Sequence, residues 1–382
     1  MIAQQNVAIN ELKKENTRNY GIDALRVLSA VMIVMLHVLS QGGILAASAD
    51  LTVRGEFMWW LQIGCLGFVN VFALISGYVG IGGKHKISNI LNLWLQVVLY
   101  TFLSKVLIMV FFEKSFSVLE LGKSFLPVIT SENWYFTAYF VLFFFLPFLN
   151  EWLEKAEQTT VKKALLFSVL LFMVVETISS VKESGIQAGY SVLWLAVMYM
   201  LGAYLKKYDP LRKLTSWQCG IGVVSCMTLT LLSKLLIELV TWKLLGTPGY
   251  GTKFLVYTSP VMVLQAVFLV QLFSHWNLPK PLQKFAVWFA PMTFGVFVIH
   301  TTTFIYRYML RDAFSFVSGH CWIVALGIGI AATIVIWFAC SGIDFLRICL
   351  FKLFRINKLT AYLGTKMEAL LNRIIKIKKM EK

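Results

Sequence analysis

Residues 20–39 read YGIDALRVLSAVMIVMLHVL, and this stretch decides the fold class of the chain. It is an apolar run of the length, about 20 residues, that an α-helix needs to cross the hydrocarbon core of a bilayer. Three ionisable side chains interrupt it, namely Asp23, Arg26 and His37. An ionisable group inside a membrane is costly unless it has a partner or faces water. The stretch therefore predicts a first membrane helix that carries functional polar groups.

The rest of the chain continues the pattern of that stretch. Of its 382 residues, 58% are hydrophobic and only 14% are charged, and the mean hydropathy is +0.73. An average soluble chain is about one quarter charged. Composition thus excludes a soluble globular protein and predicts an all-α, polytopic bundle of about ten membrane helices. The predicted spans are 22–41, 57–81, 90–112, 134–150, 164–181, 189–205, 217–240, 255–274, 285–309 and 321–345.

Lys and Arg residues are distributed unevenly between the two sets of loops. One set, with both termini, carries 24 of them and the opposite set carries 7. Cytoplasmic loops hold such an excess, so both termini are predicted to be cytoplasmic. We expect a leader at 1–21, a membrane domain at 22–345 and a basic amphipathic tail at 346–382. Location in the cell membrane and contact of the tail with anionic lipids, without nucleic acid, fit this pattern.

Ten ionisable side chains fall inside the predicted spans, and each is a candidate for function. They are Asp23, Arg26, His37, Lys105, Glu176, Lys234, Glu238, His300, Arg307 and Asp344. Three of them, Glu176, Arg307 and Asp344, lie near span ends, where a long side chain can reach the interface. Lys234 and Glu238 stand four residues apart and can neutralise each other.

Arg26 and His37 are eleven residues apart, which is about three helical turns and a rise of about 16 Å along one helix face. Asp23, one turn earlier, can hold the guanidinium of Arg26. A lone membrane histidine is equally explained by a hydrogen bond between helices. His300 lies about as deep in the ninth span, however, which predicts that both imidazoles share a polar cavity. A neutral imidazole suits the removal of a proton from a hydroxyl, whereas a metal would lack a third ligand, so no metal is expected.

Four stretches then resemble the integral-membrane type 3 acyltransferases, which modify surface polysaccharides and related acceptors. The first is YGIDALR at 20–26, followed ten residues after Arg26 by His37. The others are FALISGY at 72–78, WYFTAY at 134–139 and FGVFVIH at 294–300. Their order along the chain, from about residue 20 to 345, carries the resemblance. The chain departs from many relatives at Asn70 and Ala73, where those have aromatic residues.

The resemblance implies an enzyme of ten helices that moves an acyl group, usually acetyl, from cytoplasmic acyl-CoA to an acceptor hydroxyl. The acceptor would be a polysaccharide or a lipid-linked sugar, and no tightly bound cofactor is expected beside the acetyl-CoA donor. Arg26, held by Asp23 and assisted by Lys84 and Lys86, would bind the phosphates of CoA. His37 would act as the general base on the acceptor hydroxyl or on an intermediate carrier.

Four more residues have two interpretations each. Ser76 is either a transient acyl carrier or, as we favour, a hydroxyl that caps its own helix. Trp134, Tyr135 and Tyr139 either anchor a helix at the membrane interface or stack on a sugar ring.

The main rival to an enzyme is a transporter or flippase of a lipid-linked saccharide. Such proteins often contain inverted repeats and interrupted helices, which the sequence does not show. A scaffold for cell-wall assembly is a third possibility, and it predicts no turnover.

Overall fold

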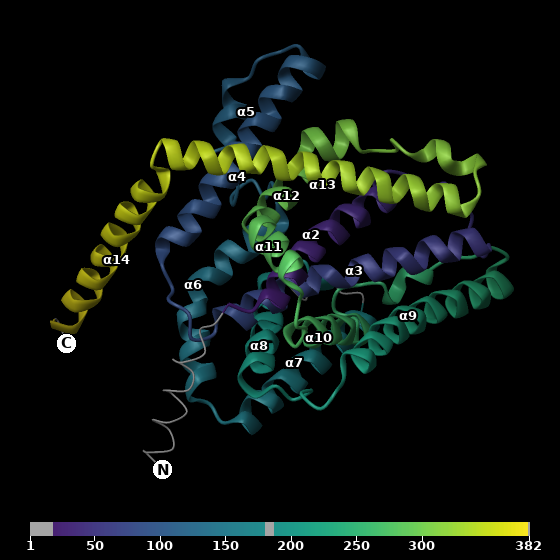
Figure 1. Cartoon of the computed structure of the whole chain (residues 1–382), viewed down its shortest axis with the longest axis horizontal. Helices are drawn as coiled ribbons and strands as arrows, with labels where there is room; N and C mark the ends of the chain where they lie inside the picture. Colours follow the sequence, from purple (N-terminus) through teal and green to yellow (C-terminus); the bar gives the residue numbers. More distant parts are fainter. Residues whose placement is uncertain (1–17, 180–186, 381–382) are drawn as a thin grey trace.

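The structure is a computed structural model that describes residues 18–179 and 187–380, and in those ranges it contains helices and no strands (Figure 1). The helices of the bundle are α2 (Tyr20–Ser40), α3 (Val53–Gly80), α4 (Ile87–Ile108), α6 (Trp134–Lys155), α7 (Gln158–Ser179), α8 (Val192–Tyr208), α9 (Ser216–Leu245), α10 (Pro260–Ser274), α11 (Lys280–Phe289), α12 (Thr293–His300) and α13 (Trp322–Leu353). Shorter or peripheral elements are α5 (Val118–Lys123) and α14 (Ile356–Met380). The all-α prediction is confirmed. Most of the predicted leader, residues 1–17, lies outside the described residues.

Within the described ranges, seven helical stretches are long and apolar enough to cross a membrane. They are Tyr20–Ser40, Val53–Gly80, Ile87–Glu113, Trp134–Lys155, Ser216–Leu245, Lys280–His300 and Trp322–Leu353. The other three predicted spans fall on α7, α8 and α10, of which α8 has 17 residues and α10 has 15. The count of ten and the side on which each terminus lies therefore stay predictions.

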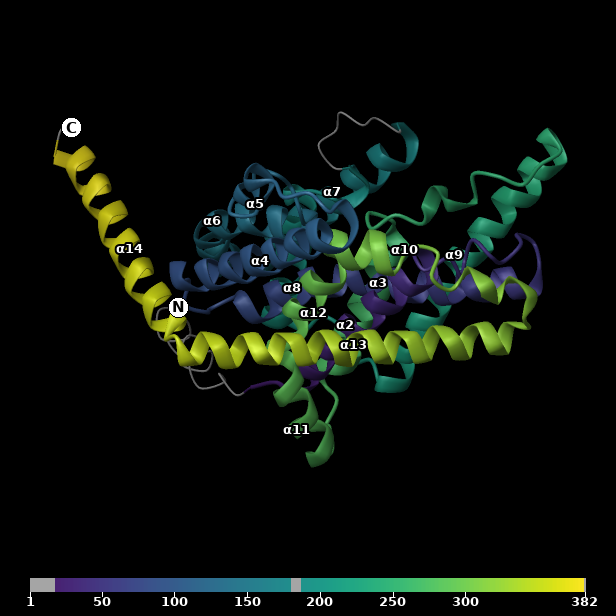
Figure 2. The ribbon, with the colours of Figure 1, turned by 90° about the horizontal axis from the view of Figure 1, so that it is seen from above.

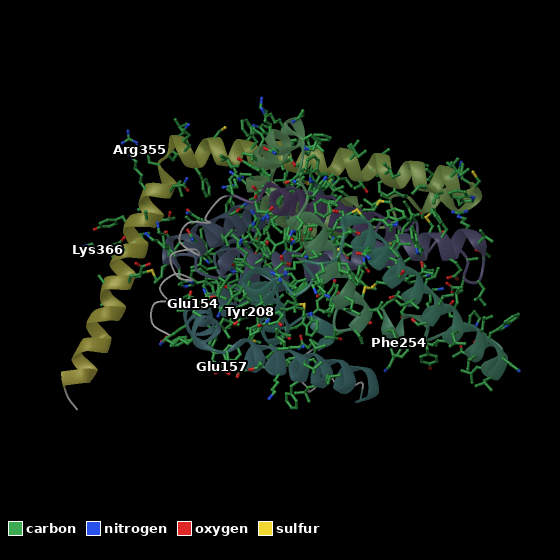
Figure 3. All side chains as sticks on the ribbon, turned by 60° about the horizontal axis from the view of Figure 1, so that its bottom comes forward. Glu154, Glu157, Tyr208, Phe254, Arg355 and Lys366 are labelled. Carbon is green, nitrogen blue, oxygen red and sulfur yellow. The ribbon has the colours of Figure 1, made fainter. Side chains whose placement is uncertain are left out.

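Residues next to several loops of the basic set lie toward one end of the molecule (Figure 3). Glu154, Glu157, Tyr208, Arg355 and Lys366 lie toward one end, and Phe254 lies toward the other (Figure 3). The five residues at the first end lie next to basic loops or in the tail. Phe254 lies in the loop before α10, which belongs to the set with few Lys and Arg. The arrangement of the helices is thus compatible with the predicted topology.

The ninth predicted span, 285–309, is interrupted rather than continuous. A 3₁₀ turn at Ala290–Met292 separates α11 from α12, and α12 ends at His300. Pro291 lacks a backbone N–H, which weakens the helix at the turn. Beyond His300, the hydroxyl of Thr301 donates to the carbonyl of Phe297 at 2.7 Å, a local bond that competes with helix continuation. His300 is consequently the last residue of its helix, beside the cavity described below.

The predicted tail, 346–382, begins in the membrane helix. α13 continues to Leu353, and α14 then leaves at a steep angle and packs along α4 (Figures 1 and 2). A carboxylate oxygen of Glu368 accepts a hydrogen bond from the backbone N–H of Ile87 at 3.0 Å, which caps the first turn of α4. Leu359 and Leu370 stay more than half exposed on α14. The tail thus presents an apolar and basic surface beside the bundle.

Helix α2 is the centre of the bundle and packs against α3, α10, α11, α12 and α13. Its neighbour α3 approaches α8 so closely that the two backbones touch. A methyl group at Gly77 would lie 1.9 Å from the carbonyl oxygen of Tyr199, and one at Gly202 would lie 2.0 Å from that of Leu74. Small residues permit such contact between membrane helices. The Ser-Gly-aromatic motif on α3 is therefore a packing motif, at least at its glycine.

Candidate active site

The two histidines singled out by the sequence meet in the structure. His37 lies near the end of α2, and its Nδ1 is 2.9 Å from Nε2 of His300 at the end of α12. The side chain of His300 is fully buried, and the ring of Tyr306 stands edge-on to the ring of His37 with centroids 5.2 Å apart. The two imidazoles form one pair, as their equal depth in the sequence predicts.

Hydrogen bonds determine which nitrogen of each ring carries a proton. Nδ1 of His300 is 2.6 Å from the carbonyl oxygen of Val296, and because a carbonyl only accepts, Nδ1 must be the donor. Nε2 of a neutral His300 is then an acceptor, and it receives the Nδ1–H of His37. Among the described residues nothing bonds to Nε2 of His37, so its lone pair is free. This tautomer is the one that can take a proton from a substrate.

His37 faces a cavity of about 290 Å³. Small-molecule sites have volumes from about 300 Å³ upward, mostly apolar walls and a few polar groups that fix orientation. The cavity has this character, because eleven of its fifteen lining residues are aliphatic or aromatic and only four, one of them His37, are other polar residues. Its lining consists of Ile33, Leu36, His37, Val69, Phe72, Glu132, Asn133, Trp134, Tyr135, Tyr190, Tyr257, Phe294, Phe297, Thr301 and Tyr306.

Three aromatic side chains from separate segments form one wall of this cavity. The ring centroid of Tyr190 lies 4.6 Å from that of Trp134 and 4.9 Å from that of Tyr257. The planes of Trp134 and Tyr257 are within 17° of parallel. Asn70 stabilises this wall through two hydrogen bonds. Its amide nitrogen donates to the carbonyl of Tyr257 at 2.8 Å, and its oxygen accepts a hydrogen bond from the indole of Trp194. The departure from an aromatic residue at position 70 thus has a structural role here.

A polar edge adjoins the aromatic wall. Glu132 lines the cavity and forms an ion pair with Lys105, with 2.8 Å between Oε1 and Nζ. Asn133 caps the first turn of α6 through its oxygen and donates from its amide nitrogen to the hydroxyl of Thr301 at 3.0 Å. Thr301 follows His300 directly, so the start of α6 is tied to the end of α12. Lys105, one of the ionisable residues that the sequence places inside a span, therefore pairs with a carboxylate at this polar edge.

At the opposite end of α2, Arg26 does not line the cavity. Its Nη1 is 3.4 Å from Oδ1 of Asp23, whose Oδ2 is 2.5 Å from Nε of Arg18. The contact of Asp23 with Arg26 agrees with the predicted one, and Arg18 is an additional partner that the sequence did not indicate. The side chain of Arg26 is 29% exposed, so part of the guanidinium stays accessible.

The remaining predicted site residues lie between these two ends. Ser76 on α3 donates to the carbonyl of Phe72 at 3.0 Å and shares a hydrogen bond with Tyr135 on α6. Tyr139, one turn further along α6, interacts electrostatically with Arg26. Together these side chains form a polar stripe from Arg26 to the cavity, along the facing sides of α2, α3 and α6. Trp134 and Tyr135 line the cavity, and Tyr139 lies deeper in the stripe.

The buried carboxylate of Asp344 packs against α12. Asp344 on α13 accepts hydrogen bonds from Gln96 at 2.7 Å, Tyr100 at 2.6 Å and Arg347 at 2.7 and 2.8 Å. Its carboxyl group lies against Gly295, where an added methyl group would be 2.1 Å away. The expectation that Asp344 extends to the interface is wrong, because it is fully buried among donors. Of the other two candidates near span ends, Arg307 is exposed, and the side chain of Glu176 lies outside the described residues.

Sequence reasoning missed several cavity residues. Tyr190 and Tyr257 lie in loops, Tyr306 lies in the short π-helix Phe304–Met309, and Glu132 and Asn133 lie just before α6. One signal was available, because Asn133 followed by an apolar run is a helix start. The tyrosines had no such signal. In the part of the chain that the structure describes, no cluster of three or more His, Cys, Asp or Glu side chains is suited to a metal ion.

The fold and this site define a helical membrane protein with a pair of imidazoles beside a small, mostly apolar cavity. Residues 19–342 match the family model described as an acyltransferase domain. The chain belongs to the type 3 acyltransferase family. Comparisons with curated proteins and with solved structures found no match.

Proposed function

We propose that this protein moves an acyl group, by default acetyl, from acyl-CoA to a hydroxyl of a cell-surface polysaccharide or lipid-linked sugar. Its family supports a membrane acyltransferase. The observation that carries the rest is the free Nε2 of His37, which faces the cavity while its Nδ1 is held by His300. This arrangement supports the proposal that His37 is a base of fixed orientation beside a space that a single acceptor ring would occupy.

The proposed reaction is a direct acyl transfer. Nε2 of His37 takes the proton of the acceptor hydroxyl as its oxygen forms a bond to the thioester carbonyl carbon. The carbon–sulfur bond then breaks, and the imidazolium returns the proton to the sulfur of CoA. The bond from Nδ1–H of His37 to His300 becomes charge-assisted while His37 is protonated, which stabilises that state.

The donor is proposed to enter at the end where Arg26 lies. A guanidinium pairs bidentately with phosphate, and the exposed part of Arg26 is free for this contact. Lys84 and Lys86 lie exposed in the loop between α3 and α4 and add positive charge. The separation between Arg26 and His37, about 16 Å along α2, requires a long and narrow donor arm. The pantetheine chain of CoA has this shape, and the polar stripe on α2, α3 and α6 would accompany it.

The test uses the purified full chain in liposomes with radiolabelled acetyl-CoA. We expect hydrolysis or exchange of acetyl-CoA without acceptor and transfer when glycan is added, with both lost in His37→Ala. His320→Ala is the matched control, because the side chain of that histidine is exposed and it is the backbone carbonyl that accepts a hydrogen bond, from Arg54. Acetyl-CoA turnover at the same rate in His37→Ala and in the unaltered protein would refute the proposal.

A further inference from the structure

Glu132 has one carboxylate oxygen in use and one available. Oε1 is paired with Lys105 at 2.8 Å, and within residues 18–179 and 187–380 no donor bonds to Oε2. The side chain is 21% exposed and lines the cavity beside Trp134. A carboxylate oxygen of this kind accepts a hydrogen bond from a hydroxyl more strongly than a neutral oxygen does.

Lys105 is fully engaged with protein groups. Besides Glu132, its ammonium donates to the carbonyl of Glu120 at 3.2 Å and lies 3.6 Å from the carboxylate of Glu120. It lines a smaller neighbouring space and not the cavity that holds His37. Among the lining residues that the structure describes, a ligand in the main cavity therefore meets the carboxylate of Glu132 and no Lys or Arg side chain.

We infer that Glu132 is a specificity residue that selects a neutral saccharide ring over an acidic one. In this arrangement the ring stacks on the wall formed by Trp134, Tyr190 and Tyr257, and one or two of its hydroxyls donate to Glu132. A uronic acid ring would place a second carboxylate in the same mostly apolar space, where like charges repel strongly. The assignment of the occupant as the acyl acceptor rests on the proposed function, whereas the selection against acidic rings is a property of the cavity itself.

The experiment measures binding, independently of the chemistry. The probes are methyl β-D-glucopyranoside and methyl β-D-glucopyranosiduronate, which differ only in a hydroxymethyl or a carboxylate at one carbon. Saturation-transfer NMR on the full chain in lipid nanodiscs gives the affinity of each. We expect the neutral glycoside to bind at least about tenfold more tightly, because a hydrogen bond to a charged group has this magnitude.

Three variants test the role of Glu132. Glu132→Gln should weaken the binding of the neutral glycoside about tenfold, and it should reduce the preference for the neutral over the acidic glycoside to less than about threefold. Glu132→Asp keeps the charge and should keep the preference. Glu120→Gln is the matched control: it removes the other acidic neighbour of Lys105 but lies outside the cavity, so both affinities should be unchanged.

Equal affinities for the two glycosides, or no binding of either, would overturn the inference. So would an unchanged preference in Glu132→Gln, or the same loss in Glu120→Gln. Acetyl transfer is measured on the same samples. A preference without any transfer contradicts the proposed function alone, and transfer without a preference contradicts only the inference about Glu132.

Discussion

His37 and Asp344 are both polar side chains inside membrane helices, and the structure uses them in opposite ways. Asp344 is fully buried, and three side chains donate to its carboxylate. His37 has one nitrogen bonded to His300, and its side chain lines a cavity of about 290 Å³. Protein donors thus satisfy the carboxylate of Asp344, whereas one ring nitrogen of His37 has no bonding partner among the described residues.

Lys234 extends the comparison. It is fully buried, yet it lies 2.9 Å from Glu56 and 2.6 Å from Glu238, so its charge is neutralised between α3 and α9. From the sequence all three residues were candidates, because burial in a membrane is costly for each, although Asp344 and Lys234 already had a structural alternative. In the structure Lys234 and Asp344 have charged partners, whereas Nε2 of His37 has no bonding partner in the ranges that the structure describes.

The largest expected effect is the loss of activity in His37→Ala. Removal of a general base costs about 10²- to 10⁴-fold in rate. The helix should still form, since His37 contributes no fully buried charge. The transfer rate and the melting temperature are measured on the same preparation. A His37→Ala protein that melts at the same temperature and transfers at the same rate as the unaltered protein would show that His37 is not the base.

Asp344→Ala should show the reverse pattern, with a loss of stability. Removing one partner of a buried ion pair leaves Arg347 unpaired in the bundle and costs about 3–5 kcal/mol. The melting temperature in detergent, followed by tryptophan fluorescence, should fall by many degrees. Glu151→Gln is the control, because that ion pair with Lys155 is exposed and should leave the melting temperature unchanged. A stable Asp344→Ala protein would contradict a structural role for the carboxylate.

His300→Ala should have an intermediate effect on the rate. The Nδ1–H of His37 would lose its acceptor, which costs about 10- to 100-fold if the hydrogen bond orients the base. His300→Gln provides an amide oxygen as a substitute acceptor and should recover part of the rate. Equal rates for the two variants would show that orientation through this bond is unimportant.

Arg26 differs from Asp344, Lys234 and His300, which are buried, because 29% of its side chain is exposed. Arg26→Ala should raise the KM for acyl-CoA about tenfold, with a smaller change in kcat, because it acts on binding. Arg26→Lys should raise this KM less, since its ammonium retains the charge, although it lacks the bidentate geometry. Steady-state kinetics at several CoA concentrations provide the measurement, and equal losses for the two variants would argue against bidentate phosphate recognition.

The smallest effect is expected for Ser76→Ala. The hydroxyl of Ser76 already bonds the carbonyl of Phe72, as expected of a helix-capping group. Activity should stay within about threefold of the unaltered protein. Mass spectrometry after brief exposure to acetyl-CoA tests the alternative directly, and an acetyl group on Ser76 would establish it as a carrier.

Local periodicity was enough to predict much of the fold. Apolar runs located the helices, and the spacing from Arg26 to His37 placed both on one helix. The break in the ninth span was missed because Pro291 lies within a run whose composition is otherwise helical. The long α13 was cut short at 345, since Asp344 and Arg347 resemble a membrane boundary when their mutual ion pair is unknown.

The site was predictable only where its residues sit in recognisable motifs. His37, Trp134 and His300 belong to such motifs, whereas Tyr190 and Tyr257 come from loops that precede different helices. Their convergence depends on the packing of α3, α8 and α10 and on the bonds from Asn70. Contacts of this kind connect residues more than 100 positions apart, and no local pattern encodes them.

The most direct test of the central claim is the tautomer of His37. Nitrogen-15 NMR of the protein with labelled histidine, compared with His37→Gln to assign the signal, reports which ring nitrogen carries the proton. The structure predicts a neutral His37 with the proton on Nδ1 and a bare Nε2, and a shift of the Nε2 signal when acceptor glycan is added. A proton on Nε2, or a signal that no acceptor changes, would contradict the account.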